Sequence, residues 1–211
     1  MGTYFRLYYG MVLPAGGLFQ RIKSRIFSFF ETMSEGADAR DGFRVLEGSA
    51  SKERIAENAG RMLDQYGDSI LRLAYSYLHN MSDAEDIVQE TLIKYMKTAP
   101  EFENEAHEKA WLLRVAANLS KNKIDYNKVR MADELSETLM ADEREDLSFV
   151  WDAVKSLPEN MRSVIHLFYH EGYSTKEIAS ILSRKESTVR SDLKRGRDKL
   201  KIVLKEVYDF D

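Results

Sequence analysis

Apolar residues recur at steps of three and four positions along most of this 211-residue chain. A helix turns once every 3.6 residues, so this spacing places the apolar side chains on one face. No segment alternates apolar and polar residues as a half-buried strand does. The sequence therefore predicts an all-α protein, and its first clear helix, within residues 61–80, has an apolar face made of Leu63, Tyr66, Ile70, Leu73, Ala74 and Tyr77.

Two further amphipathic helices are expected in the first half of the chain. Ser82 and Glu85 have the spacing of a capping box, which predicts a helix start there, and Pro100 predicts its end. The inward face of this helix is expected to hold Ile87, Val88, Thr91, Leu92 and Tyr95. The next helix is expected over residues 105–127, with an inward face of Trp111, Leu112, Val115, Ala116 and Leu119.

The second half begins with a predicted helix over residues 146–157. Another follows, with Pro158 at its first position and Gly172 as its C-terminal stop. Ser174 and Glu177 then form a second capping box, which opens a short helix.

A polar turn at residues 183–186 separates this short helix from the last one. The last helix has Val189, Leu193, Leu200 and Leu204 in phase. Two short helices joined by a tight turn are typical of a helix-turn-helix. Hydroxyl and basic side chains suit contacts with phosphates and base edges. We therefore expect DNA contacts from Thr175, Lys176, Arg184, Lys185, Ser187, Thr188, Arg190, Ser191, Lys194, Arg195 and Arg197.

Charge is segregated along the chain, although the net charge is only −4. Residues 131–146 are strongly acidic, whereas residues 187–205 are strongly basic. Modules with different partners have such a pattern. The sequence therefore predicts two small helical domains, residues 60–130 and 147–211, joined by a flexible acidic linker at residues 131–146.

Several classes of protein are disfavoured. The chain has no cysteine, which excludes disulfides and cysteine nucleophiles and fits a cytoplasmic location. His166 and His170 share a helix face, but Leu167 stands where a zinc protease has glutamate, so no metal site is expected. No cluster of residues resembles a catalytic nucleophile with its base or a phosphate-binding loop, so we expect neither an enzyme nor a cofactor.

The first thirty residues are apolar-rich, but Arg6 and Pro14 interrupt them. No run approaches the ~20 apolar residues of a membrane span, so no stable membrane insertion is expected. Residues 1–59 are interpreted as a poorly ordered extension, or as the product of a start codon assigned too early, with Met33 or Met62 as the true start.

Two regions of the chain, in this order, resemble the bacterial RNA polymerase sigma factors of the extracytoplasmic-function (ECF) type. Residues 83–91 resemble the signature of sigma domain 2, and residues 109–130 resemble its promoter-melting helix. The helix-turn-helix region resembles sigma domain 4 at Leu157, Pro158, Glu171, Gly172, Ser174, Glu177, Ile178, Ala179, Thr188, Val189, Ser191 and Leu193.

The resemblance implies a polymerase subunit that recognises and melts promoters. Docking on the beta-prime clamp helices of core RNA polymerase is implied for Asp83, Glu85, Asp86, Gln89 and Glu90. Contact with the minus-ten promoter element is implied for Asn118, Lys121, Asn122, Lys123, Tyr126, Asn127, Lys128 and Arg130, in a polar-basic surface that also includes Ser120. The helix-turn-helix is implied to bind the minus-thirty-five element, its domain to contact the beta flap, and an anti-sigma factor to be a partner.

The turn of the helix-turn-helix departs from the family pattern. Ser183 stands where the family usually has glycine, and is expected to adopt a conformation that glycine adopts more easily. Arg184 replaces an apolar residue, and Lys185 replaces a capping serine. Asp192 stands where arginine is common, and is expected either to face solvent or the polymerase, or to weaken phosphate binding.

Two rival functions remain. A helix-turn-helix regulator that acts without polymerase is the main alternative, although it has no need of the signature at residues 83–91. A DNA-joining recombinase requires a catalytic serine or tyrosine beside clustered arginines, and no such group can be placed in the sequence.

Overall fold

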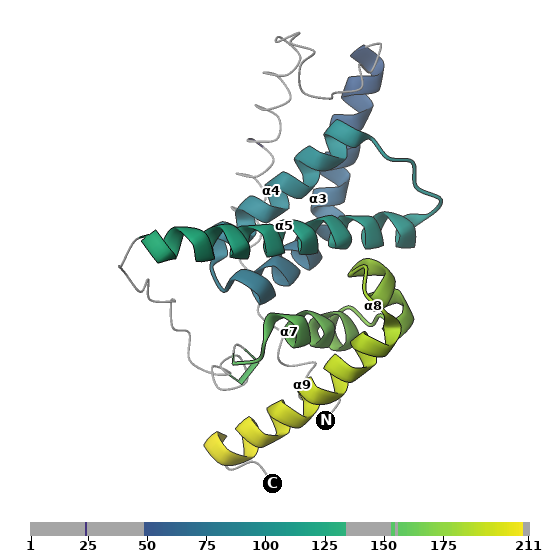
Figure 1. Cartoon of the computed structure of the whole chain (residues 1–211). Coiled ribbons are helices and arrows are strands. Elements are labelled where there is room, and N and C mark those ends of the chain that lie inside the picture. The colour runs from purple at the N-terminus through teal and green to yellow at the C-terminus, as the bar shows by residue number, and fades with distance from the viewer. Residues whose placement is uncertain (1–23, 25–48, 134–152, 155, 209–211) are drawn as a thin grey trace.

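The computed structural model describes residues 24, 49–133, 153–154 and 156–208 (Figure 1). The described residues contain helices and no strand, which confirms the all-α prediction. Most of the predicted N-terminal extension, most of the acidic linker and most of the helix predicted at residues 146–157 lie outside the described residues. Within the described part of the chain, no helix is both long and apolar enough to cross a membrane.

Three helices form the first unit: α3 (Ser49–Leu78), α4 (Met81–Thr98) and α5 (Glu105–Asp133). Their apolar stripes meet in one core, because each helix has residues of 3.6-residue periodicity on its inward face. All five residues predicted for the inward face of α4 are buried. On α5 the prediction also holds, since Leu112, Val115 and Ala116 are buried and Trp111 and Leu119 pack at the edge of the core.

The start of α4 differs from the prediction. Asn80, rather than Ser82, is the N-cap, and its side-chain oxygen accepts a hydrogen bond from the Asp83 backbone N–H at 3.0 Å. Asparagine is among the best N-cap residues, so the helix begins two residues earlier than the capping-box spacing indicates. The helix ends at Thr98, and its C-cap Ala99 has a left-handed backbone (φ 38°) directly before Pro100.

The second unit contains α7 (Glu159–Ile165), the π-helical turn η1 (His166–His170), α8 (Thr175–Ile181) and α9 (Glu186–Tyr208). Pro158 is the N-cap of α7 rather than its first residue. Gly172, with φ +76°, follows the end of η1 as predicted. The capping box of α8 is confirmed, since Ser174 Oγ accepts from the Glu177 N–H at 3.3 Å and the Glu177 carboxylate accepts from the Ser174 N–H at 2.8 Å.

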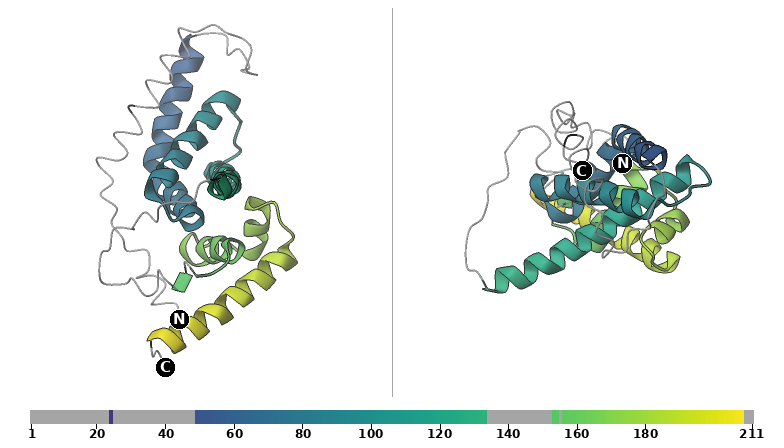
Figure 2. Two further views of the ribbon diagram at one scale, coloured as in Figure 1. Left: turned by 60° about the vertical axis from the view of Figure 1, so that its left-hand side comes forward. Right: turned by 90° about the horizontal axis from the view of Figure 1, so that it is seen from above.

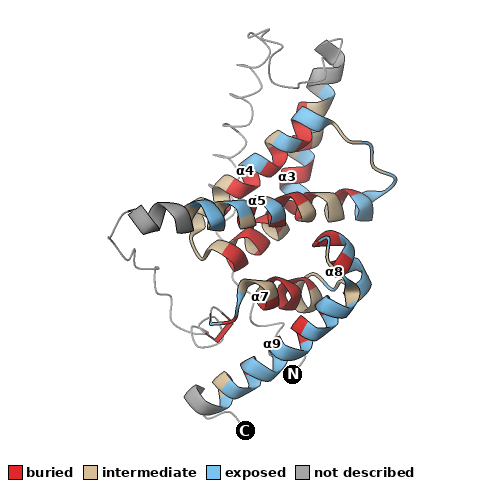
Figure 3. Cartoon of the chain, in the orientation of Figure 1, coloured by how far each residue is buried: buried red, intermediate tan, exposed pale blue. Residues whose placement is uncertain are grey.

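Close packing in the second unit depends on one glycine. A Cβ atom added to Gly196 on α9 would lie 2.6 Å from Ile165 Cδ1 of α7. A larger residue at position 196 therefore requires the end of the Ile165 side chain to shift. Beyond this crossing, the surface of α9 is mostly exposed (Figure 3).

The two units pack against one another (Figure 2). Helix α7 and η1 lie against α3, and α8 lies against α5. The first unit thus lies directly on the helix-turn-helix, and polar side chains from both units meet between them.

Candidate nucleic-acid interface

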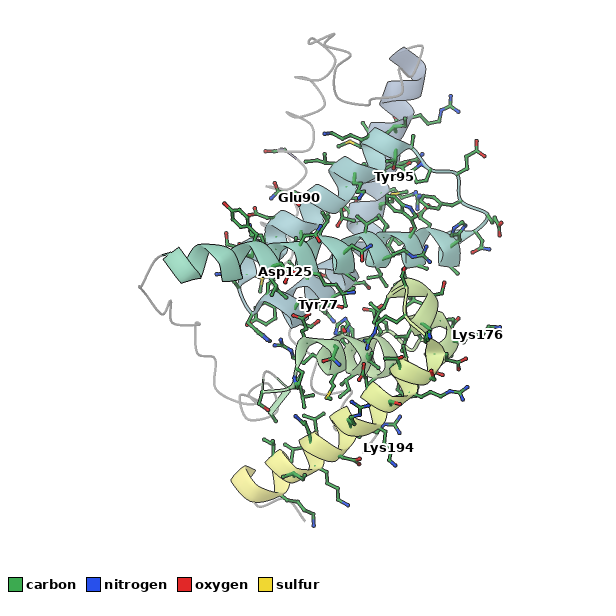
Figure 4. All side chains as sticks on the ribbon, in the orientation of Figure 1. Tyr77, Glu90, Tyr95, Asp125, Lys176 and Lys194 are labelled. Atoms are coloured by element: carbon green, nitrogen blue, oxygen red, sulfur yellow. The ribbon has the colours of Figure 1, made fainter. Side chains whose placement is uncertain are left out.

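Helix α9 presents one basic, hydroxyl-bearing surface. Val189, Leu193 and Leu200 bury the inner side of α9 against the second unit. Lys176 of α8 and Lys194 of α9 project from the outside (Figure 4). Of the residues predicted to contact DNA, those that are exposed are Lys176, Lys185, Ser187, Thr188, Arg190, Ser191, Lys194, Arg195 and Arg197.

Glu186, the first residue of α9, connects side chains of α8 and α9 on this surface. Its carboxylate accepts hydrogen bonds from Thr175 Oγ1 at 2.9 Å and from the Arg190 guanidinium at 2.6 Å. These bonds lower the pKa of Glu186 below its ordinary value. Thr175 and Arg190, from the two helices of the motif, are thus held at one carboxylate. Arg197 lies further along α9, 5.3 Å from the Phe168 ring centroid and 5.5 Å from that of Tyr169, at cation–π distance.

The turn between α8 and α9 explains the departures from the family pattern. Ser183 has φ +52°, which confirms that it adopts a conformation suited to glycine. The Arg184 N–H bonds to the Ala179 carbonyl at 2.9 Å, the six-residue closure of a Schellman motif. Lys185 is exposed, and its carbonyl accepts from the N–H groups of Thr188 and Val189 at 3.0 and 3.1 Å.

Asp192 does not face solvent, which was one of the alternatives expected for it. It is 2% exposed and forms an ion pair with Arg184. The Arg184 guanidinium also donates to the Asn160 carbonyl of α7 at 3.4 Å. A buried carboxylate requires a counterion, and the unusual arginine in the turn supplies it. Arg184 is therefore committed to the interior contact, while it stays a prediction that it also reaches DNA.

The predicted minus-ten surface lies on α5. Asn118, Asn122 and Tyr126 are exposed. Tyr126 is 60% exposed to solvent. Lys121, Lys123 and Asn127 are half-buried. Lys128 and Arg130 lie within α5, but their side chains are outside the described residues.

Ser120 does not belong to this surface. It is fully buried, and its hydroxyl donates to the Ala116 carbonyl at 2.8 Å. A serine can satisfy its hydroxyl on the preceding turn of its own helix, so a polar residue type alone did not indicate exposure.

The acidic face predicted for polymerase docking lies on α4 beside this surface. Glu90 is exposed (Figure 4), and Asp83, Glu85, Asp86 and Gln89 are half-buried. Lys123 of α5 bridges the two surfaces, with its Nζ 3.2 Å from Asp83 and 3.8 Å from Asp86. Burial opposes the charge of Lys123, but the hydrogen bond and the charges of these carboxylates outweigh it and raise its pKa.

Within the described residues, no group of three or more histidine, aspartate and glutamate side chains is placed to hold a metal ion. His166 and His170 do lie side by side, with ring centroids 5.1 Å apart. Both belong to η1, which packs against α3 where the two units meet.

Comparison with known proteins gives the same division into two units. Residues 62–129 match the family model of sigma-70 region 2, and residues 150–200 match that of sigma-70 region 4. The ECF RNA polymerase sigma factor SigE of Mycolicibacterium smegmatis is 33% identical over 182 residues, which cover 79% of this chain and 69% of the relative. The ECF RNA polymerase sigma factor SigW of Bacillus subtilis is 32% identical over 165 residues, which cover 69% and 88%.

Two solved structures share the fold. The sigma factor RpoE in complex with the anti-sigma factor NepR, from Bartonella quintana, superposes with a TM-score of 0.61 at 24% identity and covers 72% of this chain and 99% of its own. CnrH in complex with the cytosolic domain of CnrY has a TM-score of 0.52 at 22% identity and covers 75% and 93%.

A region 2 followed by a region 4, with a helix-turn-helix in the second, defines a sigma factor, a class of proteins that bind core RNA polymerase and DNA and are not enzymes. Within that class, this chain belongs to the ECF RNA polymerase sigma factors, and it directs RNA polymerase in promoter recognition and transcription initiation.

Proposed function

We propose that the acidic face of α4 docks this sigma factor on core RNA polymerase. The observation that carries this proposal is the separation of charge in one chain, with carboxylates on α4 and exposed basic side chains on α9. A regulator that acts without polymerase needs only the basic surface. The acidic face consists of Asp83, Glu85, Asp86, Gln89 and Glu90, and its complement on the polymerase is the pair of beta-prime clamp helices. Charge complementarity of this kind sets partner choice and the rate of encounter.

The exposed side of α5 is proposed to bind the minus-ten element and capture unpaired bases. Tyr126 is the exposed aromatic residue here, and Asn118 and Asn122 offer amide groups on the same helix. Stacking on an aromatic ring stabilises an unpaired base by ~1–3 kcal/mol. Extruding a base costs a few kcal/mol, so binding energy alone suffices for local melting.

The exposed surface of α9 is proposed to bind the minus-thirty-five element as a duplex, with the domain around it against the beta flap. The basic side chains there neutralise phosphates and release counterions, so binding weakens steeply with salt. Asp192 forms an ion pair with Arg184 in the interior. Specificity is therefore assigned to the hydroxyl and basic residues around it, Ser187, Thr188, Arg190, Ser191, Lys194 and Arg195.

The remaining assignments rest on the family. We place the protein in the cytoplasm, where core polymerase is found, and we propose an anti-sigma factor as its regulator, since RpoE in the solved complex is bound to one. The domain limits of 60–130 and 147–211 also remain proposals. The family matches at residues 62–129 and 150–200 support them.

Gel filtration with bacterial core RNA polymerase tests the docking surface. The wild-type chain should elute with the polymerase, and a variant with Asp83, Glu85 and Asp86 all replaced by lysine should elute alone. The matched control replaces Glu101, Glu103 and Glu105, three exposed acidic residues outside the docking face, by lysine. This control should still elute with polymerase.

Circular dichroism of both variants checks that the helices are intact. If the wild-type chain shifts promoter DNA yet never elutes with polymerase, the docking proposal is wrong and the independent regulator replaces it.

A further inference from the structure

Glu186 is an acidic residue within the basic, hydroxyl-bearing surface of the helix-turn-helix, and none of the expected DNA contacts includes it. Its side chain is 35% exposed. Hydrogen bonds from Thr175 and Arg190 hold the pKa of Glu186 below its ordinary value, so the carboxylate is charged at neutral pH. A negative charge at a DNA-binding surface repels phosphates and opposes binding to every sequence alike. Its presence there requires a role other than phosphate binding.

One oxygen of Glu186 joins the two helices of the motif. Thr175, the first residue of α8, donates to Glu186 Oε1 at 2.9 Å, and Arg190 Nη2 donates to the same atom at 2.6 Å. Thr175 directly follows Ser174, the N-cap of α8, whose side chain belongs to the capping box, so its position is fixed by the start of that helix. Through a single carboxylate, the Arg190 side chain is therefore anchored to the first residues of both helices.

Arg190 keeps most of its hydrogen-bonding capacity in this arrangement. Its side chain is 68% exposed. A guanidinium has five N–H groups, and among the described residues Glu186 is the one acceptor that the Arg190 guanidinium bonds. The remaining N–H groups are available to a ligand in solvent.

The position of Arg190 on α9 suits contact with bases. Residues near the start of a recognition helix reach base edges in the major groove, and the bond back to Glu186 keeps the Arg190 guanidinium at that end. Arg197, by contrast, lies about two turns further along, 5.3 Å from the Phe168 ring centroid. Arginine most often reads guanine, by donating to O6 and N7 together. A side chain that is already ordered loses less conformational freedom when it makes such a contact.

We propose that Glu186 is a positioning residue that sets base specificity, because it holds Arg190 ready to bind a guanine of the minus-thirty-five element. This inference rests on the proposed function, which assigns the minus-thirty-five contact to α9. Glu186 weakens binding to DNA in general and strengthens the preference for one base pair. Specificity gained at the expense of general affinity is a common property of selective interfaces.

A purely structural role for Glu186 makes a different prediction. A carboxylate in the first turn of a helix is stabilised by the helix dipole, and this effect requires neither Thr175 nor Arg190. If stability were its whole contribution, replacing Glu186 would lower the melting temperature and leave base preferences unchanged. Base preference is therefore the measurement that separates the two roles.

Selection from a randomised promoter library tests the proposal. A promoter on which the chain initiates transcription is synthesised with the bases around minus thirty-five randomised, and fragments bound by the full chain with core polymerase are sequenced. The wild-type chain should enrich guanine, and Arg190→Ala should reduce this enrichment at one position at least about fivefold, as expected for a lost bidentate contact. Glu186→Ala should reduce it at the same position about two- to twelvefold, because the arginine must then be ordered on binding.

Glu186→Gln retains a side-chain oxygen that can accept both hydrogen bonds, so it should keep most of the guanine enrichment. The matched control is Asp198→Ala, which removes one negative charge from an exposed residue of the same helix and should leave the enrichment unchanged. A variant with both Glu186→Ala and Arg190→Ala should lose no more guanine preference than Arg190→Ala alone, because the two residues act through one contact. On a scrambled duplex, Glu186→Ala should bind at least as tightly as the wild-type chain.

The proposal is overturned if Glu186→Ala or Arg190→Ala keeps the wild-type guanine enrichment. Should Glu186→Ala lose helical content by circular dichroism, Glu186→Asp takes its place. It keeps the charge at the start of α9 but withdraws the carboxylate by one methylene, and unchanged enrichment in it contradicts the proposal equally. A wild-type chain that enriches no base around minus thirty-five would instead refute the minus-thirty-five contact assigned to α9 in the proposed function.

Discussion

Arg184 and Asp192 show how two unusual residues of the helix-turn-helix depend on each other. The carboxylate is buried and the guanidinium beside it is its counterion. Asp192→Ala therefore leaves Arg184 without its partner and should lower the free energy of unfolding by about 3 kcal/mol. Urea denaturation followed by circular dichroism measures this loss.

The double variant Arg184→Leu with Asp192→Leu is the control for this prediction. Replacing a buried ion pair by apolar residues of similar size is often neutral, so most of the lost stability should return. An Asp192→Ala variant as stable as the wild-type chain would show that the pair is not a structural requirement.

Tyr126 is the residue on which base capture is predicted to depend. Tyr126→Ala removes the exposed ring and should lower the yield of melted promoter complex about 5- to 150-fold, the range that corresponds to ~1–3 kcal/mol of stacking. Tyr126→Phe retains the ring and should retain most of the activity. Permanganate reactivity of unpaired thymines on holoenzyme–promoter complexes measures melting. Equal reactivity with alanine and tyrosine would assign base capture to another residue.

At the scale of the element, helix faces were predictable because burial follows the 3.6-residue period directly. Every residue expected on the inward side of α4 is buried, and the capping box of α8 was found from two residues three positions apart. Local geometry determines both features. The start of α4 was missed because Asn80 is an equally good cap placed two residues earlier.

The sequence carried no comparable signal for contacts between different helices. Asp192 is bonded to Arg184, which lies eight positions earlier in the sequence on the other side of a turn. Glu171 is bonded to Ser69, which lies 102 positions earlier. Neither pair follows a period, and charged residues are ordinarily expected at the surface. The exposed residues of α9 were therefore predictable as a group, whereas the interior roles of Arg184, Asp192 and Ser120 required the folded structure.

At the scale of the whole molecule, lowering the pH should lower the free energy of unfolding, because the buried His166 favours its neutral form. Burial is the main reason why its pKa falls to about 3, and it lies among Glu171, His170, Arg72 and Lys109. A histidine whose folded pKa lies below its unfolded value of about 6.5 stabilises the fold above that pH, and the stability is lost as pH falls toward 3. Glu171, with a lowered pKa, adds to the loss at the acidic end of this range.

The steepest loss from one such group is about 1.4 kcal/mol per pH unit. His166→Gln is uncharged at every pH, so its free energy of unfolding should change much less between pH 6.5 and 4.5. Denaturation curves at several pH values compare the two chains. Parallel pH profiles would mean that His166 is not the titrating group.

Transcription in a purified system tests the central claim most directly. Core RNA polymerase from the source bacterium is incubated with fragments of that organism's genome, with and without this chain, and transcript start sites are mapped. We predict starts that appear only with the chain, share sequence elements about ten and thirty-five base pairs upstream, and vanish when Asp83, Glu85 and Asp86 are replaced by lysine. Identical starts with and without the chain, under conditions in which it binds DNA, would contradict its role as a promoter-specificity subunit.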